Sequence, residues 1–231
     1  MQTETVSNLV EYISIINTLA DKSHYFLLFR GQSDNDELLP NIAREDKTID
    51  TSKIEATMLS ELRRRGQLLF DSQSISDLNL LVHAQHFGMK TRLLDWSSNP
   101  LTALWFAIHK DYKLKQDSFV YAFFGPENFL AGDDTNPFEI EKTQVVKPHM
   151  NNERIVAQNG WFTIHYYSSK DKRFVPLEKN KNLKANLVTI TIPATTKVDL
   201  LKQLSRLGVN ARTVFPDLNG MCQHLNWKYT T

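Results

Sequence analysis

The sequence predicts an α+β fold built as one mixed domain. Segments typical of strands and segments typical of helices follow one another without the regular strand–helix–strand rhythm of a parallel, doubly wound sheet. The 231 residues, of which 41% are hydrophobic, are enough to bury a substantial core. No stretch with the composition of a linker divides the chain. We therefore expect one domain over residues 25–231, preceded by a helical segment at 1–24 that packs on it.

Composition and charge exclude several classes of protein. Lys and Arg number 27 against 26 Asp and Glu, so neither a broad basic face nor a nucleic-acid partner is expected. The single cysteine, Cys222, leaves no second thiol for an intrachain disulfide and fits a reducing cytoplasm. No apolar run approaches the roughly 20 residues that cross a membrane, and the start does not resemble a signal peptide. We expect a cytoplasmic protein without a membrane partner.

Apolar residues at helical spacing predict the first two helices. One covers residues 5–20, with Ser7 or Thr5 as its cap. The other lies within residues 52–70. Its expected buried stripe consists of Ile54, Met58 and Leu62.

Capping signals mark the later helices. A short helix is expected over residues 76–86, and another begins at Pro100 after the cap candidates Ser98 and Asn99. A helix that starts near residue 197 is closed by Gly208. The turn FPDLNG, with Asp217 as its capping residue, leads into the last helix.

Short aromatic and β-branched runs predict the strands between these helices. Residues 126–150 contain three prolines and a glycine, so we expect an irregular loop there. The expected strands cover residues 25–29, 118–125, 160–167, 187–192 and 212–215.

The segment FRGQ (residues 29–32) places an arginine and a glycine at the end of a predicted strand. Arginine offers a planar fork of N–H donors that suits phosphate, and a neighbouring glycine lets a ligand approach the backbone closely. Gln32 supplies a further donor. The alternative is that Arg30 only forms an ion pair with a nearby carboxylate.

A denser polar cluster follows in QHFGMKTRLLDWSSN (residues 85–99). Arg92 and Asp95 could pair with each other and fix the loop, while Ser98 and Asn99 could serve only as helix caps. The same helix start presents free backbone N–H groups, which suit an anion. The candidate binding residues of this segment are Gln85, His86, Arg92, Asp95, Trp96, Ser97 and Ser98.

A third polar group occurs in NERIVAQNGWF (residues 152–162). Glu153, Arg154 and Gln158 precede a predicted strand, and Trp161 offers a flat face for stacking. A surface ion pair between Glu153 and Arg154, and a buried anchoring role for Trp161, are the alternatives.

Other chemistries lack their sequence signatures. The seven histidines form neither HExxH nor a paired metal-ligand spacing, so no metal site is expected. The chain also has no GxSxG elbow, no P-loop lysine motif and no GxGxxG.

Four motifs in this order resemble the FRG domain, a bacterial and phage family named for its Phe/Tyr-Arg-Gly motif. They are FRGQ, QHFGMKTRLLDWSSNPLTALWFA, RIVAQNGWF and FPDLNG. The resemblance runs from about residue 25 to residue 225, and the second motif is specific because it extends over more than twenty residues.

The arrangement is also similar, more distantly, to the ADP-ribosyltransferase superfamily. This likeness implies a central, mainly antiparallel split sheet flanked by helices, with NAD as the substrate. It implies that Arg30 binds the phosphate or ribose of NAD, and that Glu153 or Gln158 takes the place of the catalytic glutamate. The residues implied to shape the nicotinamide pocket are Trp96, Ser97 and Ser98.

This chain departs from the superfamily pattern in two motifs. Asp95 and Trp96 stand where small hydroxyl residues are expected, and the third motif has no clear Gln/Glu-x-Glu. A missing carboxylate would remove roughly a few kcal/mol of charge stabilisation from a transfer reaction, although binding could survive.

Two hypotheses therefore follow, and in both Arg30 binds the anionic part of a nucleotide. The first is an NAD-dependent ADP-ribosyltransferase or NAD glycohydrolase, a toxin or phage-defence effector with an unknown macromolecular acceptor. The second is a non-catalytic module that senses a nucleotide or binds a protein. The expected catalytic residues are Arg30, Glu153 and Gln158. Outside residues 85–99, the expected binding residues are Phe29, Gly31, Gln32 and Arg154.

Overall fold

The computed structural model describes residues 2–23, 25–70, 75–110, 115–132, 134–149 and 152–230. Within this part of the chain, a seven-stranded sheet has the strand order β1-β9-β4-β2-β3-β6-β5, and β7 and β8 form a separate pair. The strands are β1 (Gln2–Thr5), β2 (Phe26–Gln32), β3 (Leu93–Ser97), β4 (Ser118–Gly125), β5 (Gln144–Val146), β6 (Gly160–Ile164), β7 (Tyr167–Ser168), β8 (Arg173–Phe174) and β9 (Leu187–Ile192).

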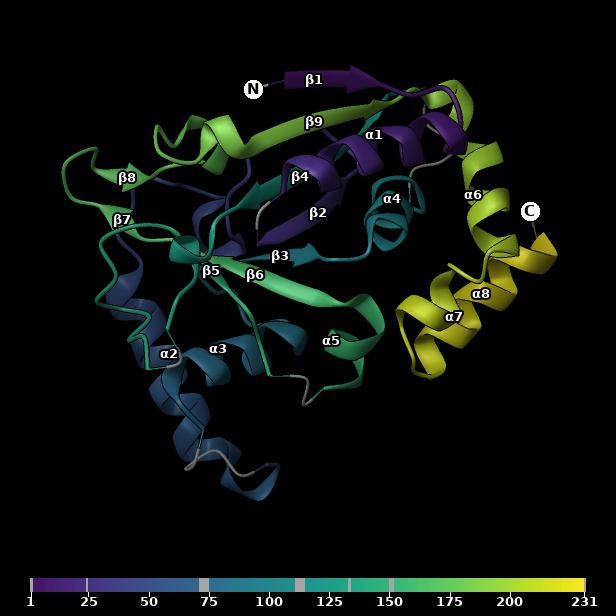
Figure 1. The fold of residues 1–231 in the computed structure, drawn as a ribbon. Coiled ribbons are helices and arrows are strands. Elements are labelled where there is room, and N and C mark those ends of the chain that lie inside the picture. Colours follow the sequence, from purple (N-terminus) through teal and green to yellow (C-terminus); the bar gives the residue numbers. More distant parts are fainter. Residues whose placement is uncertain are drawn as a thin grey trace.

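Helices pack on both faces of this sheet (Figure 1). The helices are α1 (Leu9–Lys22), α2 (Ser52–Arg65), α3 (Asp77–His86), α4 (Pro100–Ile108), α5 (Glu153–Gln158), α6 (Lys197–Arg206), α7 (Ala211–Val214) and α8 (Leu218–Thr230). The core of one face joins α1, α4 and α6 to β2, β4 and β9, and α2 and α3 pack with β3 and β6 in another core cluster. None of the described helices has the length and apolar character needed to cross a membrane.

The sheet confirms the mixed α+β class, and its pairing is antiparallel except between β1 and β9. The weakest junction lies between β2 and β3, which share only the pair of Phe29 with Ser97. By contrast, β2 pairs with β4 along its whole length, and β3 does so with β6. The sheet is therefore continuous but almost split alongside the FRGQ segment, whose first residue makes the one pair with β3.

The sequence predicts a helical N-terminal segment, but only part of this segment is helical. Its first described residues form β1, which extends the sheet by pairing in parallel with β9. Helix α1 then begins at Leu9, because Oδ1 of Asn8 accepts a hydrogen bond from the backbone N–H of Glu11 at 2.9 Å. Neither Ser7 nor Thr5 is the cap.

Three further expectations need correction. The side chain of Ile54 is 58% exposed, and α2 instead turns Glu55 and Leu59 inward. Residues 211–214 form helix α7 instead of a strand, because the side chain of Asn210 caps this short turn. The expected loop at 126–150 contains β5, which adds an edge strand to β6.

Helix α4 forms as predicted and lies directly against β2. Oδ1 of Asn99 accepts hydrogen bonds from the first turn, and Pro100 follows at the first helical position. A Cβ atom added to Gly31 would lie 1.9 Å from the carbonyl oxygen of Ala103 and 2.4 Å from the backbone nitrogen of Ala107. The glycine of the FRGQ segment thus permits the close approach of a helix, whereas the sequence had suggested the approach of a ligand.

Replacing Gly31 with Ala should destabilise the protein by about 3 kcal/mol, because the backbone of α4 must move to admit a methyl group. The matched control is Gly132→Ala, since the nearest atom to a Cβ there is 3.8 Å away. We expect that control to change stability by less than about 0.5 kcal/mol. Urea denaturation of both variants measures the difference. Equal midpoints would contradict the role assigned to Gly31.

Candidate functional site

A cleft of about 320 Å³ opens where β2 and β3 separate. It receives residues from the strand ends and from α3, α4 and α5, so segments far apart in the sequence meet there. Its lining residues are Phe29, Arg30, Gly31, Gln85, His86, Asp95, Trp96, Ser97, Ala103, Phe106, Arg154, Gln158 and Phe215.

The guanidinium of Arg30 is held in this cleft by two neighbouring groups. Its Nε donates to Oε1 of Gln32 at 3.0 Å, and one Nη donates to the backbone carbonyl of Asp95 at 2.8 Å. The other Nη has no hydrogen-bond partner among the described residues, and the side chain is 15% exposed. The structure therefore orients the arginine while leaving donor capacity free.

Asp95 is the carboxylate nearest to this guanidinium. Its Oδ2 lies 3.8 Å from the Nη of Arg30, and its side chain is 56% exposed. Burial lowers the pKa of Arg30 to about 10, and Asp95 opposes that shift. Arg30 consequently remains a cation at neutral pH, but it is only weakly neutralised by the protein.

A short chain of hydrogen bonds fixes Asp95 from the side of α3. Nε2 of Gln85 donates to Oδ1 of Asp95 at 2.6 Å, and the hydroxyl of Thr91 donates to Oε1 of Gln85. Oδ2 of Asp95 has no hydrogen-bond donor among the described residues. An ordered carboxylate oxygen therefore faces the same cleft as Arg30.

His86 lies beside this chain at the end of α3. Its ring contacts Phe162 edge-on, with ring centroids 6.0 Å apart. Burial lowers the pKa of His86, and Asp95 partly opposes this effect. The imidazole is therefore mainly neutral at pH 7, when it can both donate and accept hydrogen bonds.

A second arginine also lines the cleft. Arg154 of α5 donates to Oδ2 of Asp217 at 2.5 Å, and its guanidinium lies 5.7 Å from the ring of Phe215. The Arg154 hydrogen bond lowers the pKa of Asp217. This contact joins α5 to the segment before α8 and places Phe215 over the cleft.

A side hollow of about 300 Å³ continues from the cleft on the other side of Arg30. The two share Arg30, Gly31, Phe106 and Phe215 in their walls. The side hollow adds two cations, Arg44 and Lys110, and two carboxylates, Asp34 and Asp36. Together the two spaces are large enough for a ligand longer than one mononucleotide.

The polar atoms of Trp96 and Ser97 are occupied by the protein itself. Nε1 of Trp96 donates to the hydroxyl of Thr163 at 3.0 Å, and that oxygen lies 3.0 Å from Nε2 of His165. Burial lowers the pKa of His165 to about 3, so this chain stays uncharged. The hydroxyl of Ser97 donates to the carbonyl of Gln158 at 2.5 Å. These residues shape the cleft more than they offer bonds to a ligand.

Arg92 was expected to bind the ligand, and the structure places it elsewhere. Its side chain is buried away from the cleft, where Nε donates to Oε2 of Glu55 at 2.6 Å. Its Nη1 donates to the carbonyl of Pro137 at 2.8 Å. Burial raises the pKa of Glu55, and the charge of Arg92 opposes that rise. Arg92 therefore ties α2 to β3, and it pairs with Glu55 instead of Asp95.

Three other predicted residues also lie outside the cleft wall. Ser98 donates its backbone N–H to the carbonyl of Asn159 at 2.9 Å, which fastens the turn before α4. Glu153 lines an adjoining hollow beside Asp217, and this hollow shares His86 and Arg154 with the cleft. Gln32 contributes to the side hollow and orients Arg30 instead of lining the cleft.

Sequence reasoning missed three residues of the cleft. Ala103 and Phe106 belong to α4, for which the sequence predicted only the start at Pro100 and no binding role. Phe215 belongs to a segment for which it predicted a strand and a turn. No group of three His, Cys, Asp or Glu residues suited to a metal ion occurs among the residues that the structure describes.

Residues 26–116 match the family model of the FRG domain. This region of the chain therefore matches the FRG domain. The match includes the FRGQ segment, Gln85, His86, Asp95 and α4, whereas Arg154, Gln158 and Phe215 come from beyond it. The cleft is thus shared between the matched FRG region and the later part of the chain. No curated protein and no solved structure matches the sequence.

Replacing Glu55 with Ala should cost about 3 to 5 kcal/mol of stability, because it leaves the buried charge of Arg92 unpaired. The control is Glu61→Ala on the same helix, where the partners Arg64 and Arg65 are exposed. That change should cost less than about 1 kcal/mol. Thermal or urea unfolding separates the two cases. A Glu55→Ala variant as stable as the control would contradict the structural role given to Arg92.

Proposed function

We propose that this FRG-domain protein binds NAD in the cleft and acts as an ADP-ribosyltransferase-like enzyme. The observation that carries the proposal is the state of Arg30. Its guanidinium is oriented by Gln32 and by the carbonyl of Asp95, yet one Nη remains unpaired at the cleft surface. Such a preorganised cation suits a phosphate group, which arginine binds through several parallel N–H donors.

The remaining walls suit the other parts of a dinucleotide. Arg154 supplies a second cation in the cleft, and Phe106 and Phe215 offer aromatic rings for a base. The side hollow, which also borders Arg30, would receive the half of the ligand beyond the diphosphate. A dinucleotide bound this way would place its diphosphate at Arg30.

The chemistry needs a carboxylate near the reacting ribose, and Asp95 fits that role. In the reaction the bond between ribose C1′ and the nicotinamide nitrogen breaks, and its electron pair leaves with nicotinamide. A nucleophile, either water or an acceptor group, bonds to C1′ and loses its proton. Oδ2 of Asp95 accepts no hydrogen bond from a described residue, although it lies 3.8 Å from Arg30. It would stabilise the positive charge that develops on the ribose and accept that proton.

One observation favours a non-catalytic alternative. Gln158 already donates to the carbonyl of Val214 at 3.2 Å, and Glu153 lies outside the cleft wall. Neither expected third-motif residue is therefore placed for catalysis. A module that senses a nucleotide without cleaving it would keep Arg30 and need no carboxylate. A toxin or phage-defence role, and the acceptor of any transfer, stay predictions from the family resemblance.

Nicotinamide release from NAD tests the proposal directly. We expect release by the unaltered protein, and a loss of about 100-fold in both Arg30→Ala and Asp95→Asn, the usual scale for removing one charge-stabilising group. Arg64→Ala is the matched control because it removes an exposed arginine of α2. Asp95→Asn should still bind NAD, whereas Arg30→Ala should bind it at least about 30-fold more weakly.

The outcomes separate the two candidates. NAD binding that depends on Arg30 but yields no nicotinamide would favour the sensing module. Release that survives in a folded Arg30→Ala variant would refute the proposed site. Absence of both binding and release would refute NAD as the ligand.

A further inference from the structure

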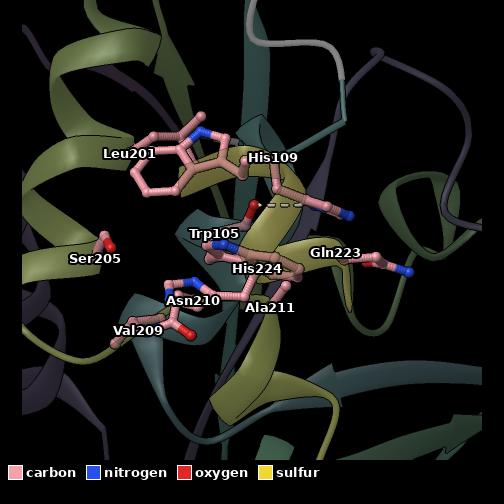
Figure 2. Close-up of a pocket in the computed structure, with 10 residues that line it drawn as sticks. Trp105, His109, Leu201, Ser205, Val209, Asn210, Ala211, Gln223 and His224 are labelled. Carbon is pink, nitrogen blue, oxygen red and sulfur yellow. Dashed lines mark hydrogen bonds between the residues drawn. The ribbon is translucent and has the colours of Figure 1, made fainter. Parts of the chain in front are cut away.

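A second cavity, of about 120 Å³, lies among α4, α6 and α8. We call it the helix cavity, and it shares no lining residue with the cleft. Figure 2 shows Leu201, Ser205 and Val209 on one side of the space and Gln223 on the other. Its other lining residues are Trp105, Leu201, Val209, Asn210, Ala211, Gln223 and Trp227.

Flat and apolar groups form most of its wall. Trp105 of α4 and Trp227 of α8 contribute two indoles, and Leu201 adds an aliphatic surface from α6. The indole of Trp105 stacks on the ring of His109, with centroids 3.9 Å apart and an angle of 13° between the planes. These contacts hold Trp105 in place and would favour a planar ligand over a bulky one.

Polar groups at the edge of the cavity lack partners. Neither the hydroxyl of Ser205 nor the side-chain amide nitrogen of Asn210 has a hydrogen-bond partner among the described residues. Nδ1 of His224 is also buried without a partner in the described structure. Only Nδ1 of His224 is a buried polar atom that is costly to leave unpaired, because Ser205 and Asn210 are half-buried at the edge of the cavity. A ligand with its own donor and acceptor would pair with all three groups.

The charge of the wall restricts the ligand further. No Asp, Glu, Lys or Arg side chain is among the residues that line the helix cavity. A charged ligand would therefore lose hydration without gaining an ion pair, which disfavours its binding.

We infer that the helix cavity binds a neutral, single-ring aromatic molecule with a hydrogen-bonding edge, such as an aromatic amide. The volume limits the ligand to one ring, because the cavity of about 120 Å³ is somewhat smaller than the apolar cavity of about 150 Å³ that holds benzene. The indoles would contact the faces of the ring, and Ser205 and Asn210 would bond its polar edge. The helix cavity shares no lining residue with the cleft, although His109 also borders the side hollow. The inference does not rest on the NAD proposal, because Trp105 and Trp227, which report binding, line neither the cleft nor the side hollow.

Benzamide is the probe for this site, and the indole N–H signals in the NMR spectrum are the readout. The protein has four tryptophans, assigned by Trp→Phe variants. Benzamide should shift the signals of Trp105 and Trp227 saturably, and leave those of Trp96 and Trp161 unchanged. Benzoate, which differs mainly in charge, should bind at least about 10-fold more weakly.

Ser205→Phe fills the cavity from α6 and should weaken benzamide binding by about 10-fold or more. Ser60→Phe on α2 is the control for adding a ring elsewhere. If Ser205→Phe fails to fold, Ser205→Leu provides a smaller filling group at the same position. The inference is overturned if benzamide produces no saturable shift, if benzoate binds equally well, or if the shifts persist in the folded Ser205 variant. Shifts confined to Trp96 would place benzamide in the cleft and would also overturn it.

Discussion

The candidate site depends on the incomplete pairing of β2 with β3. Only Phe29 and Ser97 pair between these strands, and beyond that point the backbone of β3 needs another partner. Arg30 supplies one, because its side chain donates to the carbonyl of Asp95. The same hydrogen bond links β2 to β3 where their backbones do not pair, and it fixes the guanidinium at the cleft surface. Arg30 therefore has a structural role as well as the proposed binding role. The neighbouring Gly31 lets α4 pack closely against β2.

Local signals predicted those elements that local interactions stabilise. Helix α4 begins where Asn99 and Pro100 indicate, and Gly208 adopts the positive φ that suits the end of α6. The missed elements depend on distant partners. β1 is short and polar, and it exists as a strand because it pairs with β9, nearly the whole chain away. Residues 211–214 were expected to form a strand, but they form one helical turn because the side chain of Asn210 caps it.

The roles of single residues in the site also depend on distant partners, which the sequence does not reveal. Arg30 and Arg92 could not be told apart from the sequence, because each stands in or beside a buried strand. Their roles differ because Glu55, from a separate helix, neutralises Arg92 inside the core, while Asp95 only partly neutralises Arg30 at the surface. The contact of Arg154 with Asp217, 63 positions apart, likewise follows from tertiary packing. The order of the motifs predicted which segments form the cleft, but tertiary packing determines which of their residues line it.

The most direct test of this account is a calorimetric titration with ADP-ribose, which has the diphosphate of NAD but no nicotinamide bond to cleave. The account predicts saturable binding that weakens by at least about 30-fold in Arg30→Ala, equivalent to about 2 kcal/mol, and that is unchanged in Arg64→Ala. It also predicts weaker binding in Gln32→Leu, which keeps the arginine but removes the acceptor that orients it. Equal affinity in the unaltered protein and in a folded Arg30→Ala variant would contradict the central role of Arg30.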